Sequence, residues 1–124
     1  MADNKKPDVT IWHNPRCGKS RAALALLQGR GVTVTVREYL KEPPTRAEVE
    51  MLLNALGGTP ADLVRTNEVE FAKAGKKAGA LSNKDAAALI AAHPILLQRP
   101  VVVCGKKAAI GRPPEEVLKI LPGA

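Results

Sequence analysis

Residues 8–28 read DVTIWHNPRCGKSRAALALLQ and decide how the chain begins to fold. The run 8–13 is rich in β-branched and aromatic residues and ends at a turn-forming Asn-Pro pair, which predicts a strand. Residues 20–28 are rich in helix formers, and two nearby glycines end that pattern. The loop between this strand and this helix therefore places Cys17 at the start of a helix.

Cys17 is surrounded by groups that favour a thiolate. The first N–H groups of a helix and its dipole stabilise an anion, and Arg16, Lys19 and Arg21 add positive charge close by. Arg21 follows Cys17 by four residues, which puts both side chains on one helix face. Such surroundings can lower the pKa of a cysteine from about 8.5 by roughly one to several units. We therefore predict an activated thiol rather than a small buried apolar residue.

Two neighbours of Cys17, His13 and Ser20, bear on its chemistry. His13 ends the predicted strand, where a histidine bonds the turn as often as it takes part in catalysis. Ser20 stands at the position where a CxxC redox motif would have its second cysteine. Electrons for a redox reaction at Cys17 must therefore come from outside the chain.

The rest of the chain has the pattern of an α/β domain. Its order is strand, helix, strand, a helical middle, then two strands and a helix, and residues 68–79 show no clear pattern. No repeat or linker interrupts the chain, so we expect one domain over residues 1–124. The predicted elements are a strand at 32–40, a helix opened by a Thr45–Glu48 capping box, a short helix from Thr59-Pro60, a helix over 82–92 capped by Ser82 or Asn83, a hairpin of VVVC and AAI around Gly-Lys-Lys, and a final helix over PPEEVLKIL at 113–121.

Composition limits the classes of partner. Nineteen basic and twelve acidic residues give a net charge of +7, which indicates an anionic ligand or partner. Only three aromatic residues are available for base stacking, which disfavours nucleic acid. No apolar run reaches membrane length and the N-terminus has no apolar signal region, so we expect a cytoplasmic protein with reduced thiols and no membrane partner.

The remaining cysteine and histidine residues indicate no further site. Two cysteines and two distant histidines lack the spacing of metal ligands, so we expect no metal. Cys104 lies within the apolar run PVVVC and is expected to be a core residue of a strand.

Five motifs, in order, resemble those of a known family: HNPRCGKSR, EYLKEPPTRAEV, LVRTNE, HPILLQRPVVV and GRPPEEVLKILP. Together they resemble the glutaredoxin-coupled arsenate reductase family over essentially residues 9–122. The resemblance implies an α/β, thioredoxin-like fold, in which helices flank a four-stranded mixed sheet, with a helical insertion at about 45–92. It also implies a role in arsenical resistance through reduction of arsenate to arsenite. No cofactor would be bound, glutathione would be the reductant, and glutaredoxin would be a partner.

The resemblance assigns roles to individual residues. Cys17 matches the family's nucleophilic, redox-active cysteine, and His13 matches the histidine at the end of the strand. Arg65, Arg99 and Arg112 match three arginines that bind the anion. Guanidinium groups suit that role because they stay charged and offer planar pairs of donors to an oxyanion.

Three further residues are expected to support the site: Ser20 and Arg21, from their positions relative to Cys17, and Pro100, from the resemblance. The peptide bond before Pro100 corresponds to one that thioredoxin-like folds keep cis beside the active cysteine. From that bond an extended strand would carry Cys104 about 16 Å away. A disulfide needs α-carbons within about 7 Å, so we do not expect Cys104 to be the resolving partner of Cys17.

The implied reaction begins with attack of Cys17 on arsenic and loss of water to give a thiol-arsenate adduct. Glutathione then reduces the adduct, and glutaredoxin resolves the mixed disulfide. Two alternatives stay open at this point. One is a transcriptional regulator of the Spx type that binds RNA polymerase, although CGKS lacks the CxxC switch typical of that class. The other, suggested by the net charge, is a non-catalytic binder of anions or nucleic acid.

Overall fold

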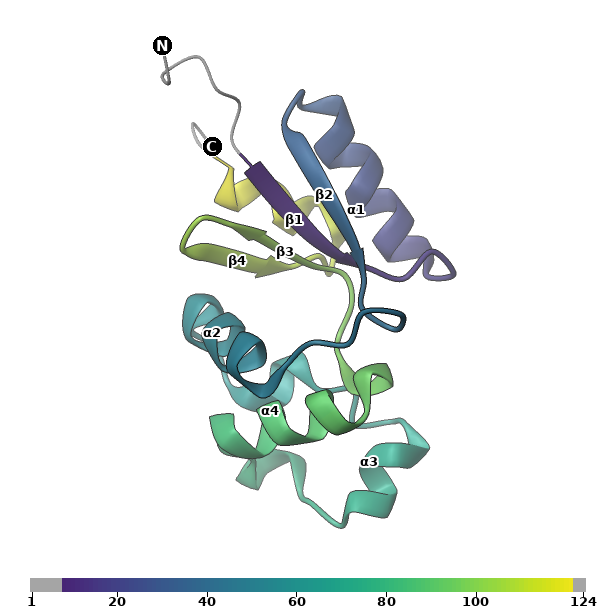
Figure 1. Ribbon diagram of the computed structural model, residues 1–124, viewed down its shortest axis with the longest axis vertical. Helices are drawn as coiled ribbons and strands as arrows, with labels where there is room; N and C mark the ends of the chain where they lie inside the picture. Colours follow the sequence, from purple (N-terminus) through teal and green to yellow (C-terminus); the bar gives the residue numbers. More distant parts are fainter. Residues whose placement is uncertain (1–7, 122–124) are drawn as a thin grey trace. The chain divides into compact units, whose positions relative to one another are not determined.

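A computed structural model describes residues 8–121, which form two compact units (Figure 1). The thiol unit combines residues 8–38 with residues 99–121 and contains Cys17. The helical unit is the segment Tyr39–Gln98 between them. The predicted insertion at about 45–92 lies within the helical unit, and the grouping of the whole chain as one domain stays a prediction.

The thiol unit is built on a four-stranded sheet in the order β2-β1-β3-β4. β1 pairs with β2 in parallel, whereas β1 with β3 and β3 with β4 are antiparallel. The sheet is therefore mixed, as predicted, and the α/β fold class is confirmed. Its strands are β1 (Asp8–His13), β2 (Thr33–Glu38), β3 (Val101–Cys104) and β4 (Lys107–Ile110).

An apolar core packs two helical elements against this sheet. Helix α1 (Gly18–Gly29) joins the two parallel strands, and the 3₁₀ helix η5 (Pro114–Ile120) ends the unit. Alternate residues of β1 and β3 meet both of them, as expected for strand periodicity. The core residues that are fully inaccessible to solvent are Val9, Ile11, Ala23, Leu27, Val102 and Val117. This packing holds the start of α1 close to the end of β1.

The helical unit contains three α-helices: α2 (Arg46–Leu56), α3 (Val69–Ala74) and α4 (Asn83–Ala92). Helices α2 and α4 pack against each other through their apolar faces. Thr45 and Glu48 form the predicted capping box of α2, and α4 begins with another, made by Ser82 and Asp85. Short 3₁₀ helices span Pro60–Leu63, Ala78–Ala80 and Pro94–Leu96.

Three predicted elements differ in detail from the structure. The final helix is a 3₁₀ helix, because Pro113 and Pro114 lack N–H donors and the bonds that follow skip only three residues, as from Glu116 N–H to Pro113 carbonyl at 3.0 Å. The hairpin turn consists of Gly105 and Lys106 alone, since the next lysine already pairs with Cys104. The second strand ends earlier than expected, at Glu38.

Candidate active site

Cys17 occupies the N-cap position of α1 with an extended backbone. Its N–H donates to the Asn14 carbonyl at 2.9 Å, which closes the turn after β1. Its carbonyl accepts the Arg21 N–H at 3.0 Å, the first bond of the helix. The side chain is half-buried. The predicted position of the thiol at a helix N-terminus is therefore confirmed.

Opposing effects set the pKa of Cys17. Burial raises the pKa of this thiol, because it disfavours the charged form. Hydrogen bonding from the Ser20 N–H, the Arg99 side chain and the Lys19 N–H lowers the pKa, and the positive charge of Arg99 adds to this. Together these donors outweigh burial, so the pKa lies below its ordinary value, as predicted.

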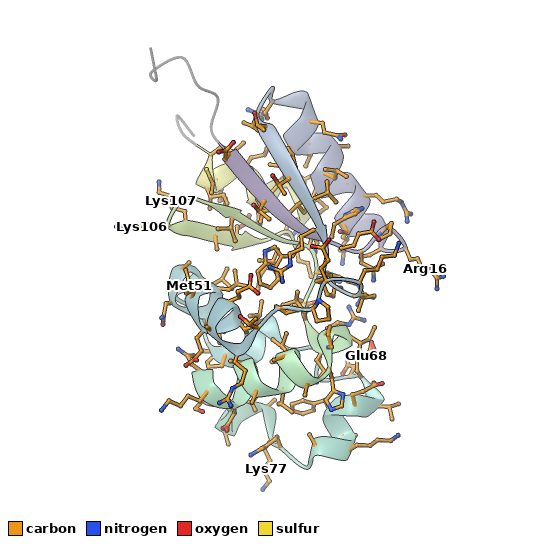
Figure 2. All side chains as sticks on the ribbon, in the orientation of Figure 1. Arg16, Met51, Glu68, Lys77, Lys106 and Lys107 are labelled. Carbon is orange, nitrogen blue, oxygen red and sulfur yellow. The ribbon has the colours of Figure 1, made fainter. Side chains whose placement is uncertain are left out.

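The source of the lowered pKa is only in part the one predicted. The helix N–H groups contribute as predicted, but the positive charge that contributes is that of Arg99 and not that of Arg16, Lys19 or Arg21. Arg16 is exposed and extends outward from the loop (Figure 2). Arg21 instead donates from Nη1 to the Pro15 carbonyl at 2.8 Å and so braces the loop. Long exposed side chains lie in water, where their charge is screened from the sulfur.

A buried network of His13, Asn14 and Ser20 stabilises the loop that carries Cys17. The Ser20 hydroxyl is inaccessible to solvent; its Oγ accepts the Asn14 N–H at 3.0 Å and lies 2.7 Å from Nδ1 of His13. Oδ1 of Asn14 accepts the Arg16 N–H at 2.9 Å. The sequence reasoning did not single out Asn14, although an Asn-Pro pair in a turn is a common place for this kind of side-chain bond.

Burial of the His13 imidazole favours its neutral form. Burial lowers the pKa of His13; the Glu38 carboxylate opposes this shift, and the positive charge of Arg21 adds to it. A neutral imidazole can accept the Ser20 hydroxyl proton at Nδ1, which satisfies both buried groups. His13 thus ends β1 as a member of the network that supports the Cys17 loop.

The segment before β3 brings two more predicted residues to the thiol. The Arg99–Pro100 peptide bond is cis, as predicted, and Arg112–Pro113 is also cis. Arg99 hydrogen-bonds the Cys17 sulfur. Arg112 donates from Nε to the Arg99 carbonyl at 2.9 Å. Seven of the predicted site residues therefore belong to the thiol unit: Cys17, His13, Ser20, Arg21, Arg99, Pro100 and Arg112.

Arg65 belongs to the helical unit. Its N–H donates to the Leu96 carbonyl at 2.7 Å, beside a short bridge between Val64 and Leu97. Its guanidinium forms an ion pair with Glu68, with 3.2 Å between Nη2 and Oε1. The expected anion-binding role of Arg65 stays a prediction.

The second cysteine has different surroundings. Cys104 is half-buried at the end of β3, on the sheet face that packs against α1 and η5. Both cysteines are free thiols in the structure. Cys104 thus lies against the core, and its exclusion from catalysis stays a prediction.

Residues 8–121 contain no group of three or more His, Cys, Asp and Glu side chains placed to hold a metal ion. Within the same range, no helix combines the length and the apolar character needed to cross a membrane.

Known proteins share both the sequence and the fold. The profile of the ArsC family matches residues 12–120. An arsenate reductase of Rhizobium meliloti is 43% identical over 114 residues, which cover 92% of this chain and 81% of the relative. An arsenate reductase of Neisseria meningitidis is 41% identical over 116 residues, covering 93% of this chain and 99% of the relative. The solved structure of an arsenate reductase from Vibrio cholerae has a TM-score of 0.86 at 39% identity, covering 94% of this chain and all of that one. The chain therefore belongs to the ArsC family.

Proposed function

We propose that this protein reduces arsenate to arsenite and that Cys17 is the nucleophile. One observation carries the proposal: the Cys17 sulfur lies at the N-terminus of α1 and is hydrogen-bonded by Arg99. A thiolate that attacks an oxyanion must approach a group of its own charge. A guanidinium and helix N–H groups at the same point offset that repulsion. Relatives named arsenate reductase, at 36–43% identity over most of the chain, support this choice of oxyanion.

The first step forms a bond between sulfur and arsenic. The Cys17 thiolate attacks As(V), one arsenate oxygen takes up protons from solvent and leaves as water, and a thiol-arsenate adduct remains. Arsenic is not yet reduced in this step. Arg99 and Arg112 act as donors to the oxygens of arsenate, whose negative charge is concentrated as the sulfur approaches. Arg65 is the third proposed donor.

The second step transfers two electrons to arsenic. A glutathione thiolate attacks the Cys17 sulfur, so that a sulfur–sulfur bond forms, the sulfur–arsenic bond breaks with both electrons on arsenic, and arsenite leaves. Glutaredoxin then attacks the glutathione sulfur of the mixed disulfide and returns Cys17 as a thiolate. The chain has no CxxC partner in its loop, since Ser20 stands there, so both electrons come from external thiols. We propose the cytoplasm as the place of action, where such thiols are kept reduced.

The direct test is arsenite formation by the purified protein. We expect turnover with glutathione and glutaredoxin together, and loss of turnover when either is omitted. Cys17→Ser should abolish activity, whereas Cys104→Ser should retain it. Mass spectrometry after incubation with arsenate in the absence of glutathione is the sharper check. A disulfide between Cys17 and Cys104, with loss of activity in Cys104→Ser, would refute the external-reductant mechanism.

The net charge supports one rival, a non-catalytic binder of anions or nucleic acid. Such a protein would bind DNA with an affinity that falls steeply as salt increases. It would form no arsenite under any combination of thiols. Binding and turnover measured on the same preparation therefore separate the two functions.

A further inference from the structure

Two successive residues after β4 hold two successive carbonyl groups before β3. The Gly111 N–H donates to the Pro100 carbonyl at 2.8 Å, and Nε of Arg112 donates to the Arg99 carbonyl at 2.9 Å. The Arg112 N–H donates to the Ile110 carbonyl at 2.9 Å, which fixes the short turn that carries both donors. The Arg99–Pro100 segment is therefore fastened at both of its carbonyls.

The absence of a side chain at Gly111 lets its backbone come close enough to Pro100 to form this hydrogen bond. Gly111 is buried, and a Cβ atom built there would lie 2.6 Å from Cγ and 3.3 Å from Cδ of Pro100, and 3.1 Å from Val117. Real Cβ atoms essentially never come within 3.0 Å of another heavy atom. The atoms in the way belong to a buried proline ring, which cannot swing aside as the end of a flexible side chain could. Any larger residue at position 111 must therefore displace Pro100 and, with it, Arg99.

The position of Arg99 matters because its side chain hydrogen-bonds the Cys17 sulfur. Hydrogen bonds weaken steeply as distance and angle depart from their optimum. A shift of the Arg99 backbone would thus weaken the bond at the sulfur without removing any charged group from the site.

We propose that Gly111 and Arg112 act as a brace that positions Arg99 against the Cys17 sulfur. Gly111 does so through the space it leaves for Pro100, and Arg112 through its bond to the Arg99 carbonyl. Arg112 is then a positioning residue even when no oxyanion is bound. The inference deepens the proposed function and rests on it for the use of Cys17 as the nucleophile.

The test measures the thiol without arsenate. Rates of alkylation of Cys17 by iodoacetamide are recorded against pH in a Cys104→Ser background, so that only one thiol reacts. The variants are Gly111→Ala, Arg112→Lys and, as matched control, Gly29→Ala, where an added Cβ would meet nothing within 4 Å. Circular dichroism and thermal unfolding verify that each variant is folded.

We expect the alkylation midpoint to rise by about half a pH unit or more in Gly111→Ala and Arg112→Lys, and to stay unchanged in Gly29→Ala. Arg112→Lys is decisive if Gly111→Ala fails to fold, because lysine keeps the charge and loses the Nε donor. An unchanged midpoint in Arg112→Lys overturns the brace. Arsenate turnover is assayed separately on the unsubstituted protein. Its absence, together with a shifted midpoint, would refute the proposed function and leave the brace standing.

Discussion

The helices of the two units begin in opposite ways. In the helical unit, α2 and α4 start with capping boxes, in which Glu48 and Asp85 accept the N-cap N–H groups at 2.9 and 3.2 Å. In the thiol unit, α1 starts at Cys17 and has no acidic residue in its first turn. The Cys17 side chain is not a capping group of the usual kind. The N–H groups of Lys19 and Ser20 instead favour its thiolate and lower its pKa. The N-terminal ends of α2 and α4 therefore interact with carboxylates, whereas the N-terminal end of α1 is available to stabilise the Cys17 thiolate.

The units also differ in charge. Residues 1–38 and 99–124, which include the thiol unit, contain twelve basic and five acidic residues, a balance of +7. Residues 39–98 contain seven of each, a balance of zero. The whole net charge of the chain therefore belongs to the part that carries Cys17. This is the distribution expected if the charge serves an anion at the thiol rather than general solubility.

The largest expected effect comes from changing Arg99. If the thiol unit alone activates the sulfur, Arg99→Lys should raise the pKa of Cys17 and lower arsenate turnover by about tenfold or more, because lysine keeps the charge but loses the planar pair of donors. Arg30→Lys, at the exposed end of α1, is the matched control. Alkylation against pH and arsenite formation measure the two effects. Unaltered kinetics in Arg99→Lys would remove this residue from the mechanism.

The next effect comes from giving α1 the kind of helix start found in the helical unit. Lys19→Glu introduces an acid into the first turn of α1, where a carboxylate competes with the thiolate for the same N–H groups and repels it. We expect the alkylation midpoint of Cys17 to rise by about half a pH unit. Lys19→Gln, which removes only the charge, should change the midpoint little, since the lysine contributes through its backbone N–H. Equal shifts in both variants would mean that the lysine charge itself activates the thiol.

Local features of the thiol unit could be predicted from the sequence, whereas contacts between distant segments could not. The strand, loop and helix around Cys17 are local features, encoded by β-branched density, an Asn-Pro turn and helix formers, and they were predicted correctly. The cis bond before Pro100 was predicted as well, through family resemblance. The helix N–H groups that lower the pKa of Cys17 were predicted, but the charged group that does so was assigned wrongly. Loop cations were expected, but Arg99 is brought to the sulfur only by the pairing of β1 with β3.

Long-range contacts explain part of what the sequence reasoning missed. The bond from Arg112 to the Arg99 carbonyl depends on the register of β3 and β4, which a single sequence does not specify. The Asn14 side-chain bond to the Arg16 N–H is local and was missed although an Asn-Pro turn signals it, whereas the burial of Ser20 that receives the Asn14 N–H has no signature in the sequence. The ion pair of Arg65 with Glu68 is local, between residues three apart, and it was missed because residues 68–79 show no clear pattern.

A smaller effect should separate the stability of the helical unit from the chemistry of the thiol. Thr45→Ala removes the hydroxyl that accepts the Glu48 N–H at 3.1 Å, which should lower the free energy of unfolding by about 1 kcal/mol. Urea unfolding measures this loss. Asn54→Ala, at an exposed position of the same helix, should change stability by less than about 0.5 kcal/mol. The alkylation midpoint of Cys17 should be the same in both variants. A midpoint shifted by Thr45→Ala would contradict the assignment of thiol activation to the thiol unit.

The smallest expected effect compares the two histidines, one in each unit. His13 is buried and His93 is exposed. Because burial lowers the pKa of His13, the unfolded chain binds a proton at this residue more readily than the native protein does. The free energy of unfolding should therefore fall as the pH drops from about 6.5, the ordinary histidine value, toward the lower native pKa, and this contribution should be constant above 6.5. His13→Asn should remove that part of the pH dependence, whereas His93→Asn should keep it. Urea unfolding at a series of pH values measures the slopes, and an unchanged slope in His13→Asn would show that the buried imidazole does not cause it.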